Sequence, residues 1–103
     1  MRISAIILLV AVVAPPAFAA EISGTPRIVD GDTVMIGQTK IRLSGIDAPE
    51  TDQLCLDAKG EKWACGIAAR DALIKYSNGQ PWDCDLTGTD QSGRSLGTCF
   101  HRR

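Results

Sequence analysis

Three carboxylates and two arginines are the side chains of this 103-residue sequence that could do chemistry together. Asp32 follows a tight turn, Asp47 and Glu50 follow an alternating segment that carries Arg42, and Arg94 follows a glycine. Two carboxylates, with backbone carbonyls and water, make an oxygen-rich site for a hard cation such as Ca²⁺. Two guanidinium groups can hold phosphate oxygens while a further carboxylate activates water. The set therefore suits phosphoryl chemistry.

Each of these residues also has an ordinary structural interpretation. Asp30-Gly31-Asp32 is typical of a hairpin turn, and it fails as an EF-hand loop because Val34 stands where an oxygen ligand is required. Arg42 could be a solvated residue of a strand, and Glu50 could simply begin a turn after Pro49. The residue types alone leave both interpretations open.

Five short strands and one helix are expected to position the candidate residues. Alternating or β-prone segments predict strands at residues 25–29, 33–36, 39–46, 82–86 and 94–100, and apolar spacing predicts a helix at residues 61–76. Tight turns make the first three strands an antiparallel meander, so Asp32 and Asp47 are expected to converge. The order β-β-β-α-β-β predicts a mainly β, α+β domain, and the five-stranded OB-fold barrel has this order.

The predicted helix has two faces that differ in what they can cover. One stripe at helical spacing suits the core, and it consists of Cys65, Ala69, Ala72, Leu73 and Tyr76. Ile67 and Ile74 lie on the opposite side, which indicates a second surface that needs a partner.

Four cysteines predict two disulfides in an oxidising compartment. A turn centred between residues 91 and 92 places Cys84 directly opposite Cys99 on neighbouring antiparallel strands, at a separation that a disulfide can bridge. Cys55 and Cys65 form the remaining pair and would join the loop to the helix. Zinc is the competing explanation, but the sequence has no C-x-x-C pair and a single histidine near its end.

Residues 1–19 have the layout of a cleavable signal peptide, with Arg2, an apolar run at residues 5–13 and small residues at the cleavage site. The alternative is an uncleaved membrane anchor, which Pro15-Pro16 disfavours by interrupting the run. We therefore expect a periplasmic or secreted protein with one domain at residues 20–103 and no membrane attachment after cleavage. Basic and acidic residues are nearly balanced, 11 against 12, which disfavours nucleic-acid binding by non-specific charge alone.

Four motifs occur together, in order and with sensible spacing. They are Val29-Asp30-Gly31-Asp32-Thr33-Val34, Ile41-Arg42-Leu43, Gly45-Ile46-Asp47-Ala48-Pro49-Glu50-Thr51 and Asp90-Gln91-Ser92-Gly93-Arg94. The series resembles the staphylococcal nuclease (thermonuclease) family over about residues 25–100. The resemblance implies an OB-fold and a calcium-dependent nuclease that hydrolyses DNA and RNA phosphodiester bonds to 3′-phosphate ends.

The resemblance also implies a role for each candidate residue. Asp32 and Asp47 correspond to the Ca²⁺ carboxylates, and Ala48 to a residue that binds the ion through its backbone carbonyl. Glu50 corresponds to the carboxylate that positions or activates the attacking water. The two arginines that hold the phosphate and stabilise the transition state correspond to Arg42 and Arg94. The expected partner is a DNA or RNA substrate, and the expected state is a monomer.

The end of the sequence departs from the family pattern. Family members continue after the fifth strand with helical structure, whereas this sequence stops at Arg103. This predicts a C-terminally truncated member, which could be an inactive fragment of a longer nuclease, a poorly folding member or a minimal domain held by its disulfides. Two other functions stay open, a non-catalytic OB-type module that binds oligonucleotides and a small disulfide-stabilised structural or inhibitory protein.

Overall fold

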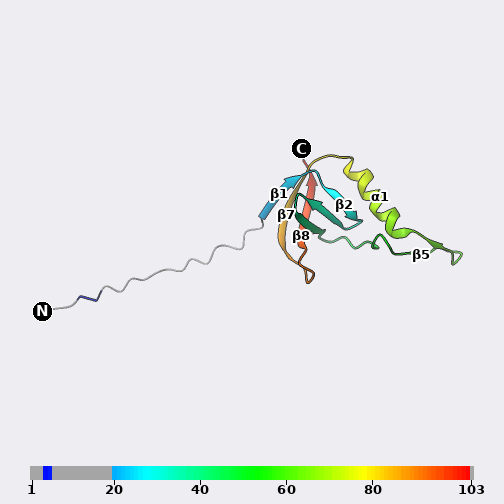
Figure 1. The fold of residues 1–103 in the computed structure, drawn as a ribbon, viewed down its shortest axis with the longest axis horizontal. Coiled ribbons are helices and arrows are strands. Elements are labelled where there is room, and N and C mark those ends of the chain that lie inside the picture. Colours follow the sequence, from blue (N-terminus) through cyan, green and yellow to red (C-terminus); the bar gives the residue numbers. More distant parts are fainter. Residues whose placement is uncertain (1–3, 6–19, 103) are drawn as a thin grey trace.

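The computed structural model describes residues 4–5 and 20–102, which form eight strands and one helix (Figure 1). The predicted signal peptide at residues 1–19 lies outside the described residues, apart from residues 4 and 5. The elements in chain order are β1 (Ala20–Gly24), β2 (Arg27–Asp30), β3 (Thr33–Ile36), β4 (Thr39–Leu43), β5 (Cys55–Leu56), β6 (Lys62–Trp63), α1 (Cys65–Ser77), β7 (Trp82–Thr89) and β8 (Ser95–His101). Among the described residues, no helix is long and apolar enough to span a membrane.

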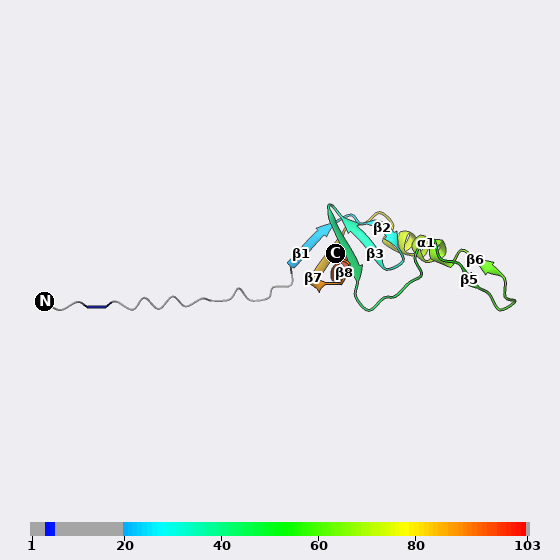
Figure 2. The same ribbon diagram turned by 60° about the horizontal axis from the view of Figure 1, so that its bottom comes forward.

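Six strands form one sheet in the order β1-β7-β8-β4-β3-β2. β4 and β8 run parallel, and the other neighbouring pairs are antiparallel. β1, at one edge, also contacts β3, so the mixed sheet curls into a half-barrel (Figure 2). β5 and β6 form a separate two-stranded arm that extends away from the sheet, beyond the start of α1 (Figures 1 and 2). The predicted class, mainly β with one helix, is confirmed.

The strand bounds differ from the prediction at several places. β7 continues to Thr89, beyond the predicted end at residue 86, and the short strands β5 and β6 were not predicted. The first predicted strand, at residues 25–29, is wrong in its limits because β1 ends at Gly24 and β2 begins at Arg27, after Pro26 has interrupted the pairing. The third was predicted to reach residue 46, but β4 ends at Leu43 because Gly45 turns the chain with a left-handed φ of 76°. The chain therefore leaves the sheet just before Asp47.

The helix is shorter at its start than the sequence predicts. Residues 62–63 were assigned to it, but they pair with β5 as β6, so α1 begins at Cys65. It ends close to the predicted position, where Asn78 adopts a φ of 47° and donates its N–H to the Ile74 carbonyl over 3.0 Å.

The predicted core face of the helix is only partly correct. Cys65 is buried and Leu73 packs against the core, but Tyr76 is 65% exposed. The helix packs beside β2, and at the turn that follows β2 an added Cβ on Gly31 would lie 2.8 Å from the Cβ of Ala69. Tyr76, near the end of the helix, lies largely outside this contact. Ile67 and Ile74 are exposed, as expected for the opposite face.

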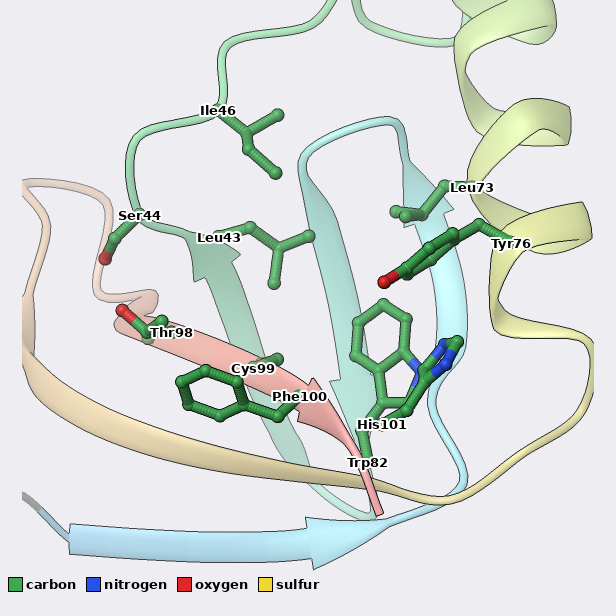
Figure 3. Close-up of a pocket in the computed structure, with 11 residues that line it drawn as sticks. Leu43, Ser44, Ile46, Leu73, Tyr76, Trp82, Thr98, Cys99, Phe100 and His101 are labelled. Atoms are coloured by element: carbon green, nitrogen blue, oxygen red, sulfur yellow. The ribbon is translucent and has the colours of Figure 1, made fainter. Parts of the chain in front are cut away.

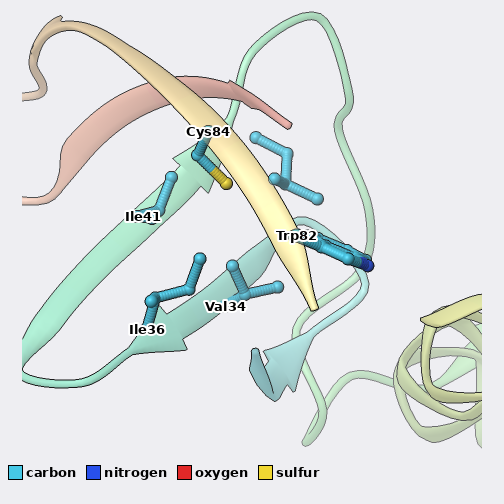
Figure 4. Close-up of a cluster of buried hydrophobic side chains, with 6 residues drawn as sticks. Val34, Ile36, Ile41, Trp82 and Cys84 are labelled. Carbon is cyan, nitrogen blue, oxygen red and sulfur yellow. The ribbon is translucent and has the colours of Figure 1, made fainter. Parts of the chain in front are cut away.

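The hydrophobic core lies between the curled strands (Figure 4). It takes one alternate face of β3, β4 and β7, as the period-two pattern requires. Its buried members are Val34, Ile36, Ile41, Leu43, Trp82 and Cys84. This core holds β3 and β4, and hence the turn that carries Asp32 and the strand that carries Arg42.

Both predicted disulfides are confirmed. Cys84 and Cys99 are register partners in β7 and β8 and are bonded, with their Cα atoms 4.0 Å apart. Cys55 and Cys65 are bonded with their Cα atoms 5.6 Å apart, and they join β5 to the first residue of α1. Disulfides of this kind persist in oxidising compartments, so the pair indicates a protein that functions outside the cytoplasm.

Candidate functional site

Asp32 is a buried carboxylate at the turn between β2 and β3, with a relative exposure of 7%. Its Oδ1 atom accepts a hydrogen bond from the Thr33 hydroxyl at 2.9 Å, and its Oδ2 atom accepts one from the Ala48 N–H at 3.2 Å. A buried carboxylate needs such partners because burial removes its hydration. The Ala48 contact also fixes the loop after β4 against the turn.

Arg42 links the two carboxylates that the sequence predicts to converge. It lies in β4, opposite Thr33 of β3. Its Nη2 atom is 3.7 Å from Asp32 Oδ2 and 3.4 Å from Asp47 Oδ1. Asp32 and Asp47 therefore face one guanidinium group, although Asp32 is buried while the Asp47 side chain is 93% exposed.

Arg94 is held in a fixed orientation by the turn between β7 and β8. Its Nε atom donates to Asp90 Oδ2 over 2.7 Å, and the backbone N–H groups of Ser92 and Arg94 donate to Asp90 Oδ1. Burial raises the pKa of Asp90, but the hydrogen bonds from Arg94 and Ser92 outweigh it and hold the pKa below its ordinary value of 3.8. The Nη1 atom of Arg94 reaches the hydroxyl of Thr33 at 3.3 Å.

Two neighbouring hollows connect Glu50 with the arginines. An open cavity of about 600 Å³ is lined by Glu50 and Arg94 together with Lys40 and Thr51. A second hollow of about 350 Å³ is lined by Arg42 and Arg94. Arg94 borders both, so the five candidate side chains lie around one region of the surface. A ligand in these hollows would meet two guanidinium groups and the exposed Glu50 carboxylate.

Sequence reasoning missed three residues of this region. Thr33 is fully buried and is the hydrogen-bonding link between Asp32 and Arg94. Asp90 was read only as part of a turn, but its carboxylate orients Arg94. Lys40 adds a cation beside Glu50. The signal for Asp90 is present in the sequence, because an aspartate that begins a turn commonly accepts backbone N–H groups two to four residues ahead.

The donor set suits a hard cation but does not enclose one. Among the described residues, no three His, Cys, Asp or Glu side chains are grouped closely enough to hold a metal. Asp32, Asp47 and the Ala48 carbonyl offer oxygen atoms only, the ligand type that Ca²⁺ prefers, and water would have to complete six to eight ligands. The Asp32 and Asp47 carboxylates both lie within 4 Å of the Arg42 guanidinium group, so a positive charge already stands next to both of them. The residues therefore fit Ca²⁺ in donor chemistry, with solvent supplying part of the coordination.

A hollow with a largely apolar lining lies elsewhere, between α1, β8 and the end of β4 (Figure 3). It measures about 320 Å³, and Tyr76, Trp82 and Phe100 line it together with Leu43 and Leu73. The indole N–H of Trp82 is buried there and has no hydrogen-bond partner among the described residues. None of the five candidate residues lines this hollow, so it is distinct from the candidate site.

Two curated proteins have sequences similar to this chain. The chain is 40% identical over 83 residues to the succinoglycan biosynthesis protein ExoI of Rhizobium meliloti, and the match covers 80% of this chain and 44% of that protein. It is 37% identical over 97 residues to protein ParB of Escherichia coli, with 90% of this chain and 49% of that protein covered. The chain thus spans about half the length of the curated relatives it matches. It matches no protein-family profile and no solved structure.

Proposed function

We propose that this protein is an exported, calcium-dependent nuclease of the staphylococcal nuclease type, which hydrolyses DNA or RNA to 3′-phosphate ends. The observation that supports it most strongly is the arrangement of charged groups around Arg42 and Arg94. Arg42 contacts both Asp32 and Asp47, and Arg94 borders the same cavity as Glu50. A two-arginine site with carboxylates at its edge is what in-line hydrolysis of a phosphodiester requires.

We propose that the sheet is an OB-fold. β1 and β2 are consecutive and separated only by residues 25–26, so they count as one bent strand. With β3, β4, β7 and β8 this makes a five-stranded, partly open barrel, and α1 lies between its third and fourth strands as in the proposed fold.

The two arginines bind the scissile phosphate in this proposal. Each guanidinium group presents parallel N–H donors that match phosphate oxygens. Asp90 orients Arg94 through its Nε atom and Thr33 through its Nη1 atom, and the guanidinium group borders both hollows, where a ligand would meet it. Arg42 lies in β4, opposite Thr33, and borders the smaller hollow together with Arg94. Charge that develops on the phosphoryl oxygens in the transition state is thereby stabilised.

Glu50 acts on the attacking water. Its side chain is exposed at the cavity, so water has access to it. Glu50 takes a proton while the water oxygen bonds to phosphorus, and the bond from phosphorus to the 5′ oxygen breaks. The 5′ oxygen takes up a proton from solvent and leaves as a hydroxyl, and the phosphate stays on the 3′ side. General base catalysis of this kind contributes about 10²–10⁴-fold to rate.

Asp32, Asp47 and the Ala48 carbonyl are the proposed calcium ligands. Bound Ca²⁺ supplies Lewis-acid polarisation of a phosphoryl oxygen and positive charge. Around the two hollows and Arg42, carboxylates outnumber basic side chains, with Asp30, Asp32, Asp47, Glu50, Asp52 and Asp90 against Lys40, Arg42 and Arg94. An anionic substrate would be repelled from such a surface, so the excess of negative charge favours a site that also holds a cation.

Cleavage of a fluorescence-quenched single-stranded DNA by the oxidised protein, in Ca²⁺ and in EDTA, tests the proposal. We expect cleavage only with Ca²⁺, and its loss in Glu50→Gln. Glu61→Gln is the matched control, because Glu61 is an exposed glutamate within the arm, between β5 and β6. Near-UV circular dichroism of each sample shows whether the protein is folded. A folded wild-type protein that binds the DNA equally in Ca²⁺ and EDTA and leaves it intact would indicate an OB-type binding module instead.

A further inference from the structure

The loop at residues 44–54 carries Asp47, Ala48 and Glu50. Besides the hydrogen bond from the Ala48 N–H to Asp32, three attachments hold its second half to the rest of the protein. The first attachment is to β2. The Oδ1 atom of Asp30, the last residue of β2, accepts a hydrogen bond from the N–H of Thr51 over 2.9 Å. This bond holds the backbone immediately after Glu50 against the sheet.

The second attachment is to the first turn of α1. The Glu50 carbonyl lies so close to Gly66 that a Cβ atom added to Gly66 would overlap the carbonyl oxygen. The Gly66 N–H also donates to the Gln53 carbonyl over 3.3 Å. A residue without a side chain is therefore required at position 66 for the loop to pass at this distance.

The third attachment is covalent. The disulfide between Cys55 and Cys65 joins the residue that follows the loop to the residue before Gly66. It limits how far the end of the loop can move from the helix, and so it preserves both contacts of Gly66.

The Glu50 carboxylate depends on these attachments for its position. Among the described residues, no hydrogen bond reaches the side chain of Glu50, which is exposed at the cavity. Its backbone N–H donates to the Gln53 side chain over 2.6 Å, and Gln53 belongs to the same loop. The location of the carboxylate is therefore set by where the backbone of residues 50 and 51 is held.

We infer that Asp30, Gly66 and the Cys55–Cys65 disulfide are positioning groups that hold Glu50 at the cavity. The inference rests on the proposed function for the role of Glu50, while the attachment itself can be measured without it. A displacement of about 1 Å of a catalytic group can cost about 100-fold in rate, so a loosened loop lowers the rate of chemistry. We expect substrate affinity to change less than the rate of chemistry, because Arg42 and Arg94 lie outside the loop.

Asp30 offers the sharpest test because its charge can be removed either together with the hydrogen bond or without it. Asp30→Ala removes the acceptor for Thr51 N–H, whereas Asp30→Asn keeps an oxygen acceptor and removes the charge. We expect Asp30→Ala to lower kcat at least about tenfold with KM changed less than about threefold, and Asp30→Asn to recover most of the loss. Asp57→Ala is the matched control, because Asp57 accepts the N–H groups of Lys59 and Glu61 within the arm.

Amide hydrogen exchange at Thr51 and Gly66 is the readout that does not depend on activity. Both amides should exchange faster in Asp30→Ala and in the double variant Cys55→Ser/Cys65→Ser, while the amides of β3 and β4 stay protected. Unchanged exchange at both amides, or a kcat of Asp30→Ala equal to that of the wild type, would overturn the inference. A wild-type protein that cleaves no DNA would instead refute the proposed function, and the exchange data would still decide whether the loop is held this way.

Discussion

The Nη1 atom of Arg94 lies 3.3 Å from the hydroxyl oxygen of Thr33, a residue 61 positions earlier in the chain. The same hydroxyl donates to Asp32 over 2.9 Å. This single hydroxyl connects the proposed calcium-binding half of the site with the proposed phosphate-binding half. Thr33 is completely buried, so water does not compete for either hydrogen bond.

Thr33→Val is expected to disturb both halves at once. Valine has a similar shape but no hydroxyl, so Asp32 loses a donor and Arg94 loses an acceptor. Loss of such a supporting partner typically costs about 10–100-fold in activity or metal affinity, and we expect a decrease of that size in kcat/KM. Thr39→Val, at the start of the neighbouring strand β4, is the control. Equal kcat/KM in Thr33→Val and the wild type would show that the link has no functional role.

Arg94→Lys should abolish most of the activity although it keeps the positive charge. The planar guanidinium group of Arg94 contacts Asp90 and Thr33 and at the same time borders the hollows. Lysine has a single ammonium nitrogen and cannot make all these contacts at once. We expect KM to rise and kcat to fall, measured by initial rates on single-stranded DNA. Arg102→Lys is the matched control, since Arg102 forms an ion pair with Asp83 away from the candidate site. An Arg94→Lys enzyme with wild-type kinetics would contradict the role of the guanidinium group.

Much of the fold could be predicted because local patterns determine it. The β-prone run at residues 33–36 and the turn at residues 90–93 place β3 and the last hairpin correctly, and the hairpin register places Cys84 opposite Cys99. The start of the helix could not be predicted. Residues 62–63 suit a helix locally, but pairing with β5 and the disulfide to Cys65 keep them in the arm.

The candidate side chains could be identified from the sequence, but the residues that hold them in place could not. Asp32 and Asp47 were expected to converge, and the structure brings both to Arg42. The links through Thr33 and Asp90 depend on distances between segments far apart in the chain, which periodicity does not encode. Gly66 likewise shows no signal in the sequence, because its need for a bare Cα arises only when the Glu50 carbonyl lies against it.

Removal of the Cys84–Cys99 disulfide should destabilise the protein strongly. The bond closes a separation of 15 residues, which corresponds to about 3 kcal/mol in the chain-entropy model, and Cys84 is also part of the buried core. We expect Cys84→Ala/Cys99→Ala to lower the free energy of unfolding, measured in urea, by about 3 kcal/mol or more. Cys55→Ala/Cys65→Ala serves as the comparison and should cost less, because it leaves the core intact. A loss below about 1 kcal/mol for the first variant would contradict this account.

Asp90 should make stability depend on pH in the acid range. Its pKa is lower in the folded protein than the ordinary 3.8, so its contribution is present above that value and is lost as pH falls through the folded pKa. We expect the unfolding temperature of the wild type to fall more steeply below about pH 4 than that of Asp90→Asn. Asp83 also has a lowered pKa, through hydrogen bonds from Ser23 and Arg102. The unfolding temperature of Asp90→Asn should therefore still fall with pH, but less steeply than that of the wild type. Identical slopes for the two proteins would contradict the pairing of Asp90 with Arg94.

The central claim is that water attacks phosphorus at this site and leaves the phosphate on the 3′ side. A short DNA of defined sequence, incubated with the oxidised protein and Ca²⁺ in H₂¹⁸O, tests it by mass spectrometry of the fragments. We expect one ¹⁸O atom in a 3′-phosphate, an unlabelled 5′-hydroxyl on the other fragment, and no products in EDTA or with Glu50→Gln. Intact DNA in the presence of folded protein and Ca²⁺, or ¹⁸O in a 5′-phosphate, would contradict it.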